Sequence, residues 1–249
     1  MRQRVRGCRM GQYRSGTFIM SFNELPDPVV LPHVDVWIFD LDNTLYPADS
    51  NLFALIDARM TRFIEDLYGC DAVEAHRIQK RYFHEHGTTL SGLMADRRVD
   101  PHAFLDFVHD IEVDRLDHDA RLVAAVAALP GRKLVFTNGD VTYAQRVLDK
   151  LGLGTSFEAI HDIHAMDYIP KPAPASYAAL CDRWDIAPTS ALFVEDMARN
   201  LAPAQALGMT TVWINNGSEQ AGGAACPSYI DYEITDLGDW LHDVTGELS

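Results

Sequence analysis

Polar side chains follow three apolar segments of the sequence, in places unsuited to a hydrophobic core. They are Asp40 and Asp42 after residues 34–39, Thr137 and Asn138 after residues 134–136, and Glu195 and Asp196 after residues 191–194. Short runs of apolar, β-branched and aromatic residues are typical of buried strands in a parallel sheet. Ligand sites in such sheets lie outside the carboxyl ends of the strands, so we expect these side chains to meet at one edge. Taken alone, Asp42-Asn43-Thr44 is equally consistent with a turn or a helix cap.

Carboxylates gathered at one edge repel one another unless a cation lies among them. Hard oxygen ligands select magnesium or a similar ion, so the sequence predicts a divalent metal. Thr137 and Asn138 occupy a strand-to-helix turn, where side-chain donors and free backbone N–H groups can hold an anion. Lys171 is flanked by Pro170 and Pro172, which stiffen its segment. Its charge is therefore well placed to neutralise a bound anion.

The elements that must position these residues follow from the spacing of the apolar residues. From about residue 120, strands at 134–136, 157–160, 191–194, 210–214 and 229–233 alternate with helices at 121–129, 141–151, 175–184, 197–207 and 237–244. This alternation predicts an α/β fold, a doubly wound parallel sheet covered on both faces. Residues 49–118 have helical character, with amphipathic helices over 52–67 and 72–86 and a short helix from Pro101. Residues 87–93 interrupt this pattern with glycines and hydroxyl side chains.

We divide the chain into three parts. Residues 1–22 form a basic N-terminal arm, which we expect to be disordered, because five arginines and no acidic residue occur before residue 20. Residues 23–48 and 119–249 form the α/β core domain, and residues 49–118 form a helical cap domain inserted after the first strand. The arm is also compatible with an organellar transit peptide, or with a natural start at Met20.

Composition excludes several classes of partner. The formal net charge of −15 and the sequence pI of about 4.9 disfavour a nucleic acid polymer or an anionic membrane. No apolar run approaches the roughly 20 residues that span a bilayer. The four cysteines lack the spacing of a disulfide framework or a zinc site, so we expect a cytoplasmic protein. The oligomeric state cannot be read from these features.

Four motifs then give the chain a resemblance to the haloacid dehalogenase-like hydrolases. They are Asp40-Leu41-Asp42-Asn43-Thr44, Phe136-Thr137-Asn138, Lys171, and Glu195-Asp196-Met197-Ala198-Arg199-Asn200, in the family's order. The resemblance covers residues 34–216 and implies a Rossmann-like core with a small helical cap. It also implies that Asp40 attacks phosphorus to give an aspartyl-phosphate.

In this family the second aspartate distinguishes phosphate-ester chemistry from dehalogenation, because a halide leaves without a proton. The resemblance implies that Asp42 protonates the leaving alcohol and then activates water. Mg²⁺ is expected on the Asp40 carboxylate, the Asp42 backbone carbonyl and Asp196. The resemblance implies that Glu195 supports these ligands without binding the metal itself, although either Glu195 or Asp196 is a candidate for direct contact with the metal.

The same resemblance assigns the remaining site residues. Thr137, Asn138 and Lys171 are expected to hold the transferring phosphoryl group. Asn200 lies four residues after Asp196 on the following helix, where it is a candidate for binding metal-coordinated water. Many family members have Asp at the position of Asn200, so this metal site carries one negative charge fewer.

The substrate should be determined by the cap. Residues 86–93, together with residues 136–140 and 198–201, resemble the branch that contains pyrimidine 5′-nucleotidases, with Thr88 and Thr89 as candidates for binding a base or ribose. Alternatively, this segment is only a turn between helices. The sequence therefore predicts a magnesium-dependent phosphomonoesterase acting on a small phosphate ester, a pyrimidine nucleoside 5′-monophosphate. The alternatives are a sugar-phosphate phosphatase or phosphomutase, or a binding module without turnover.

Overall fold

The structure, a computed structural model, describes residues 6–7, 31–217 and 227–246. Its strands are β1 (Arg6–Gly7), β2 (Val36–Phe39), β3 (Arg132–Phe136), β4 (Ala159–His161), β5 (Ala191–Glu195), β6 (Thr210–Ile214) and β7 (Tyr232–Ile234). Its helices are α1 (Leu52–Tyr68), α2 (Ala72–His86), α3 (Thr89–Arg97), α4 (Pro101–His109), α5 (Ala120–Ala128), α6 (Val141–Leu151), α7 (Pro174–Trp184), α8 (Ala198–Leu207) and α9 (Leu237–Thr245). Two 3-10 turns, η1 (Ala48–Ser50) and η2 (Pro188–Ser190), complete the described elements.

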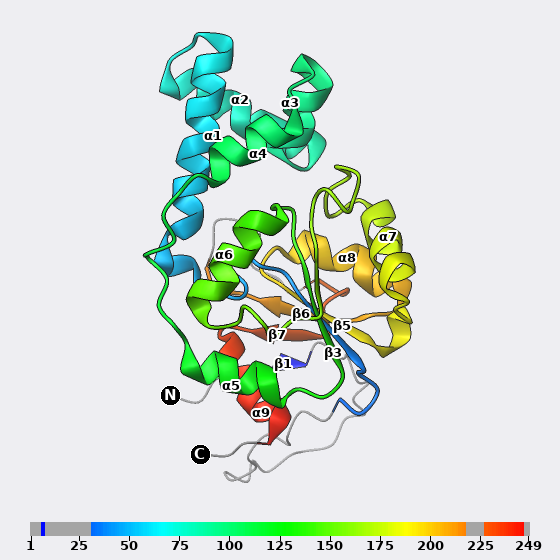
Figure 1. Cartoon of the computed structure of the whole chain (residues 1–249). Coiled ribbons are helices and arrows are strands. Elements are labelled where there is room, and N and C mark those ends of the chain that lie inside the picture. Colours follow the sequence, from blue (N-terminus) through cyan, green and yellow to red (C-terminus); the bar gives the residue numbers. More distant parts are fainter. Residues whose placement is uncertain (1–5, 8–30, 218–226, 247–249) are drawn as a thin grey trace, which may run out of the picture.

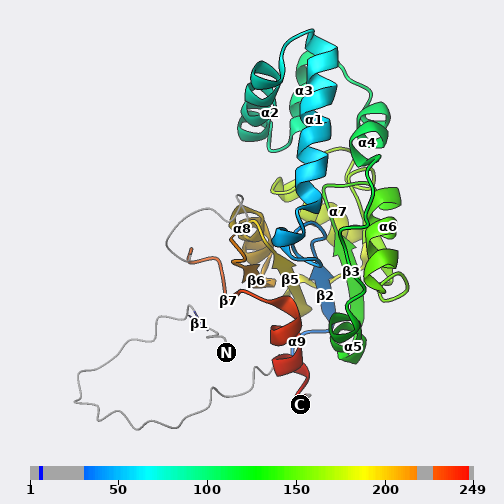
Figure 2. The same ribbon diagram turned by 90° about the vertical axis from the view of Figure 1, so that its left-hand side faces the viewer.

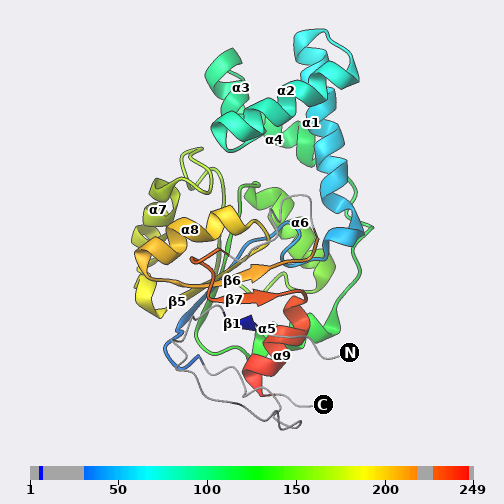
Figure 3. The same ribbon diagram turned by 180° about the vertical axis from the view of Figure 1, so that it is seen from behind.

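The strands form one sheet in the order β1-β7-β6-β5-β2-β3-β4. The six strands from β7 to β4 pair in parallel, and β1 pairs antiparallel with β7. Helices α5 and α6 cover one face of the sheet, and α7 and α8 cover the other (Figures 1 and 3). The predicted doubly wound α/β fold is therefore confirmed.

The central strand β2 places the first aspartate at the middle of the sheet. It lies between β3 and β5, with Phe39 opposite Val135 and Val194. All four residues of β2 are buried, as expected for a strand covered on both faces. Strands β2, β3 and β5 are parallel, so the residues that follow them emerge at the same edge.

Helices α1–α4 form a separate helical module beyond this edge of the sheet (Figure 2). Side-chain caps explain where three of these helices begin. Asp71 accepts the N–H of Glu74 at the start of α2, Thr88 accepts the N–H of Ser91 at the start of α3, and Asp100 caps α4 ahead of its first residue, Pro101. The module connects to the core through residues 40–51 and 110–119.

Most sequence predictions of helices and strands agree with the structure, with one correction. Residues 87–93 were expected to interrupt the helices, but α3 begins at Thr89 and continues to Arg97. Gly92 lies inside α3, where a Cβ atom would come 2.4 Å from the side chain of Tyr82. This glycine serves close helix packing and does not break the helix.

The predicted N-terminal arm falls mainly outside the described residues, as does Met20. Within it, Arg6 and Gly7 pair with Glu233 and Tyr232 as strand β1. In the ranges that the structure describes, no helix combines the length and the apolar character needed to cross a lipid bilayer.

Candidate active site

Asp40 and Lys171 form a buried ion pair at the carboxyl end of β2. Lys171 Nζ donates to Asp40 Oδ1 at 2.6 Å and to the carbonyl oxygen of Phe136 at 2.7 Å. The side chain of Lys171 is only 1% exposed, and its ammonium also lies 5.0 Å from the centre of the Phe136 ring. The lysine is thus fixed between the ends of β2 and β3, as its proline-flanked segment suggested.

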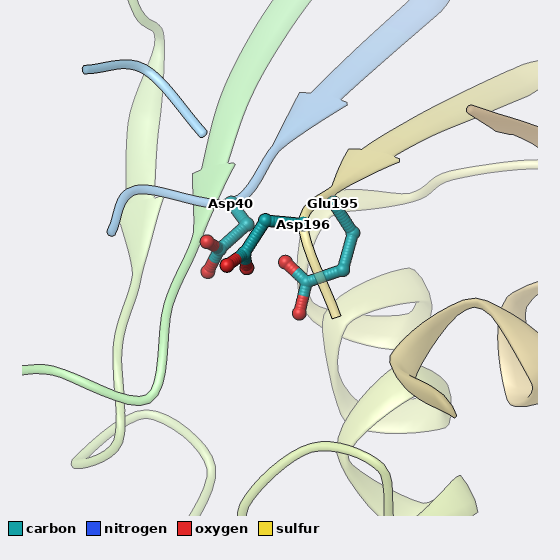
Figure 4. A group of neighbouring side chains, drawn as sticks. All are labelled: Asp40, Glu195 and Asp196. Atoms are coloured by element: carbon teal, nitrogen blue, oxygen red, sulfur yellow. The ribbon is translucent and has the colours of Figure 1, made fainter. Parts of the chain in front are cut away.

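Three carboxylates converge beside this pair. Asp40, Glu195 and Asp196 are all buried and each offers an oxygen within 4.8 Å of the others (Figure 4). Glu195 ends β5 and Asp196 follows it, so both approach Asp40 from the neighbouring parallel strand. The structure therefore places Glu195 in the cluster itself, whereas the sequence resemblance placed it behind the other carboxylates.

The electrostatics of this cluster fit a bound cation. Burial and the negative charge of Asp40 raise the pKa of Glu195 well above its ordinary value, although Lys171 opposes this effect. Burial alone would lower the pKa of Lys171, but the charges of Asp40 and Glu195 outweigh it and raise that pKa. Glu195 Oε2 is buried without a hydrogen-bond partner, and it lies 3.6 Å from Lys171 Nζ. Lys171 lies within 4 Å of two of these three carboxylates, and a cluster of carboxylate oxygens of this kind suits Mg²⁺.

Asn200 supports Glu195 from the first turn of α8. Its Nδ2 donates to Glu195 Oε1, while its Oδ1 is buried without a hydrogen-bond partner. The carbonyl of Asn200 also accepts the hydroxyl of Tyr177 at 2.5 Å. Asn200, the predicted neighbour of the metal site, is therefore at the cluster, and no donor in the described part of the chain satisfies its Oδ1.

The second aspartate, Asp42, lies apart from the cluster and is held by two tyrosines. The hydroxyls of Tyr46 and Tyr143 donate to Asp42 Oδ1 at 2.7 and 2.8 Å. Burial and the nearby charge of Asp40 raise the pKa of Asp42, while the two tyrosine hydrogen bonds and the charge of His109 oppose the rise. A carboxyl group with a raised pKa is suited to donate and accept a proton near neutral pH.

Sequence reasoning missed the residues behind Asp42. His109 and Asp140 form a buried ion pair, and the His109 ring stacks on Tyr143 with centroids 4.4 Å apart. Asp140 also caps α6 by accepting the N–H of Tyr143 at 2.8 Å. Burial alone would raise the pKa of Asp140, but its hydrogen bond with His109 and the charge of His109 lower it. Of these contacts, only the helix cap formed by Asp140 could have been expected from the sequence, because Asp140 directly precedes α6. The contacts of His109 join segments that are far apart in the sequence.

The predicted phosphate-binding residues are placed as follows. Thr137 is fully buried, and its hydroxyl accepts the N–H of Gly139 at 3.0 Å. Asn138 clamps the backbone of Lys171, because its Oδ1 accepts the Lys171 N–H at 2.9 Å and its Nδ2 donates to the Lys171 carbonyl at 3.2 Å. The Asn138 side chain thus fixes the lysine, a role that the sequence did not suggest.

A pocket of about 300 Å³ lies between the helical module and the core. Its walls are His86, Gly87 and Ser91 on one side and the loop 168–173, which includes Lys171, on the other. Arg199 closes the contact by donating to the Gly87 carbonyl at 3.1 Å and lying 4.4 Å from the Phe83 ring centre. The pocket therefore borders the segment that carries Lys171.

Thr88 and Thr89, the two threonines that we expected to bind a base or ribose, lie at the start of α3 within the helical module. The Thr88 hydroxyl caps α3 and contacts the Ser91 hydroxyl at 2.9 Å, and Thr89 is 5% exposed. Neither threonine lines the pocket, whereas Ser91 does. Thr88 is therefore the N-cap residue of α3, and Ser91 is the hydroxyl residue of this segment that lines the pocket.

The fold and the site together define an α/β protein with an acidic cluster at the centre of its sheet edge. Residues 34–208 match the model of the haloacid dehalogenase-like hydrolases, and this chain belongs to that family. The match begins before the first aspartate motif and ends after the last acidic motif. The family prediction made from the four motifs is thus confirmed.

Known proteins of similar sequence and fold agree with this assignment. Phosphate metabolism protein 8 of Saccharomyces cerevisiae is 28% identical over 203 residues, which cover 75% of this chain and 62% of that protein. The chain therefore spans less than two thirds of the length of this relative. Among solved structures, a HAD phosphatase from Thermococcus onnurineus has a TM-score of 0.55 at 19% identity, covering 81% of this chain and 94% of that one.

Two further structures share the fold. The HAD-hydrolase YfnB of Bacillus subtilis, bound to magnesium, has a TM-score of 0.54 at 16% identity, covering 84% of this chain and 97% of that one. The L-2-haloacid dehalogenase of Xanthobacter autotrophicus has a TM-score of 0.52 at 18% identity, covering 86% and 99%. These low identities establish a common fold only.

Proposed function

We propose that this chain is a magnesium-dependent phosphomonoesterase that works through Asp40. The observation that carries the proposal is the pairing of the buried cluster of Asp40, Glu195 and Asp196 with a second carboxyl group, Asp42, whose pKa is raised. An alkoxide leaving group needs a proton and a halide does not, so Asp42 favours phosphate esters over haloacids. The name of the yeast relative, a phosphate metabolism protein, supports the same choice.

In the proposed reaction, the Asp40 carboxylate attacks phosphorus while the bond from phosphorus to the ester oxygen breaks. Asp42 gives its proton to that oxygen, and the alcohol leaves. Asp42 then takes a proton from water as that water attacks phosphorus. The bond from phosphorus to the Asp40 oxygen breaks, which releases inorganic phosphate and regenerates the Asp40 carboxylate. Lys171 contributes a fixed positive charge beside the transferring group, and Thr137 supports the turn that receives it.

The residues that would hold magnesium are Asp40, Glu195 and Asp196 through their carboxylates and Asp42 through its backbone carbonyl, with Asn200 beside them. A magnesium ion there would neutralise the charge that develops on the phosphoryl group. The magnesium-bound Bacillus subtilis relative supports this choice of ion. Within this proposal, Glu195 is a direct ligand because its Oε2 is buried, unsatisfied by hydrogen bonds and part of the cluster.

For the substrate we propose a nucleoside 5′-monophosphate with a pyrimidine base. The helical module, residues 49–118, acts as the cap domain in this proposal, and the core is formed by residues 23–48 and 119–249. The pocket between them has a volume within the range of small-molecule sites and combines polar groups from His86 and Ser91 with an apolar wall. Ser91 replaces Thr88 and Thr89 as the cap residue that we expect to contact the base or ribose.

The catalytic part of the proposal is tested with p-nitrophenyl phosphate in the presence of Mg²⁺. Asp40→Asn should release no phosphate while its thermal unfolding stays cooperative. Asp182→Asn, the same change at an exposed position of α7, should leave turnover unchanged. Wild-type turnover in Asp40→Asn would show that another group is the nucleophile.

The substrate part is tested separately by kcat/KM for UMP, CMP, AMP and glucose 6-phosphate. The proposal predicts the highest values for UMP and CMP, and an increase in KM for UMP in Ser91→Ala with little change for p-nitrophenyl phosphate. Equal values for all four esters would contradict base recognition without affecting the assignment of Asp40.

A further inference from the structure

We propose that Tyr46 and Tyr143 are positioning residues that hold one oxygen of Asp42 and leave the other oxygen to exchange a proton with the leaving group. This inference rests on the proposed phosphatase function. It concerns how the acid is oriented, and it involves two residues that none of the four sequence motifs contains.

The two tyrosines occupy both acceptor positions of one carboxyl oxygen of Asp42. Both hydroxyls donate to Oδ1 of Asp42, at 2.7 and 2.8 Å, and they lie 3.4 Å from each other. A carboxyl oxygen offers two lone pairs to hydrogen-bond donors. With both lone pairs of Oδ1 engaged, Oδ2, which neither tyrosine contacts, is the oxygen left to exchange a proton with the leaving group. The arrangement therefore selects which oxygen delivers the proton.

Both tyrosines are held rigidly enough to keep this geometry. Each side chain is 1% exposed. The Tyr143 ring is stacked on His109 with an interplanar angle of 11°, and its backbone N–H is bound by Asp140, which also pairs with His109. Precise orientation of an acid requires such a supporting set of contacts.

The supporting residues come from both connections between the helical module and the core. Tyr46 lies in the first connection, between β2 and α1, and His109 is the last residue of α4. Arg146 on α6 binds the carbonyl oxygens of His109 and Ile111 and so fixes the start of the second connection. The residues that orient Asp42 thus belong to both connections between the helical module and the core.

A merely structural role for the tyrosines makes a different prediction from a positioning role. If the hydroxyls only stabilise the core, their removal lowers the rate for every ester to the same extent. If they orient Asp42, the loss depends on the leaving group. p-Nitrophenolate leaves as a stable anion, whereas the alkoxide of an alkyl ester must receive a proton from Asp42 Oδ2 as its bond to phosphorus breaks.

The test compares kcat/KM for p-nitrophenyl phosphate with that for glycerol 2-phosphate, an alkyl ester without a base. We expect Tyr143→Phe and Tyr46→Phe each to lose at least about tenfold on the alkyl ester, a part of the roughly 100-fold to 10,000-fold effect of general acid catalysis. The loss on p-nitrophenyl phosphate should stay below about threefold. Tyr68→Phe is the matched control, since Tyr68 is the last residue of α1 and its hydroxyl donates to Asp96 at 2.8 Å.

A double-mutant cycle completes the test. In an Asp42→Asn background, Tyr143→Phe should cause no further loss on glycerol 2-phosphate, because the group that it orients no longer carries a proton. Equal losses on the two esters, or a full additional loss in the Asp42→Asn background, would overturn the positioning roles. A wild-type chain that releases phosphate from neither ester would overturn the proposed function, and the positioning roles with it.

Discussion

Lys171 offers the sharpest perturbation of the buried cluster. Its Nζ lies 2.6 Å from Asp40 Oδ1 and 3.6 Å from Glu195 Oε2, and its side chain is 1% exposed. Lys171→Met keeps an unbranched side chain that is one atom shorter and removes the positive charge from these two contacts. Two unit charges 4 Å apart interact by about 4 kcal/mol at an effective dielectric constant of about 20. Burial of the lysine offsets part of this attraction.

We therefore expect Lys171→Met to lower the free energy of unfolding by about 3–5 kcal/mol, the usual cost of leaving one partner of a buried ion pair without the other. Urea unfolding in the presence of a chelator measures this value without interference from a bound metal. Adding Asp40→Asn to Lys171→Met should restore part of the loss, because the stranded charge is then gone. Turnover of p-nitrophenyl phosphate by Lys171→Met should also be lost.

Lys150→Met is the matched control. Lys150 Nζ lies 3.5 Å from Asp114, but the lysine side chain is 36% exposed and the aspartate side chain 82% exposed. Surface pairs of this kind contribute about 0–1 kcal/mol. If Lys171→Met lowers the free energy of unfolding no more than Lys150→Met does, and still turns over p-nitrophenyl phosphate, the electrostatic interpretation of the cluster is wrong.

Three further predictions concern the metal, pH and packing. Chelation should stop turnover reversibly, and Mg²⁺ should raise the Tm of wild type more than that of Glu195→Gln; full activity without metal would contradict the cluster assignment. Burial and the charge of Arg183 lower the pKa of His161 to about 4 from an ordinary 6.5. Below about pH 6.5 the unfolded chain binds a proton that folded His161 does not, so stability falls by up to about 3 kcal/mol towards pH 4. His161→Gln should flatten this slope in urea titrations, and an unchanged slope would exclude His161 as its source. Gly92→Ala should lower the free energy of unfolding by about 1–3 kcal/mol, although alanine has the better helix propensity. The control Gly238→Ala, also in a helix, should be neutral or stabilising. Thermal unfolding of both variants measures the difference, and equal effects would contradict close packing at Gly92.

The sheet and most helices could be predicted because their signals are local. A buried strand such as β2 is a continuous apolar run, and helices such as α1 repeat apolar residues at spacings of three and four. Helix α3 was missed because glycine has two physical uses. At Gly87, with φ of 84°, it ends α2, whereas at Gly92 it allows close contact with α2. Only the packed neighbours distinguish these uses.

The site was predictable to the extent that its residues follow strands. Asp40, Glu195 and Asp196 meet because parallel neighbours deliver them to one edge, a consequence of topology that the sequence already indicated. Contacts made by side chains across the fold could not be read in this way. Asn138 holds the backbone of Lys171, 33 residues away, and Tyr143 reaches Asp42 over a separation of 101 residues.

The central claim is that Asp40 carries the phosphoryl group, and trapping the covalent intermediate tests it most directly. The enzyme is mixed with substrate and Mg²⁺, quenched in acid within a single turnover and treated with borohydride, which reduces an acyl phosphate to an alcohol. Peptide mass spectrometry should then find homoserine in place of Asp40, and the change should be absent in Lys171→Met. Burst release of the alcohol with Asp40 unmodified, or with the modification on another residue, would contradict the proposed mechanism.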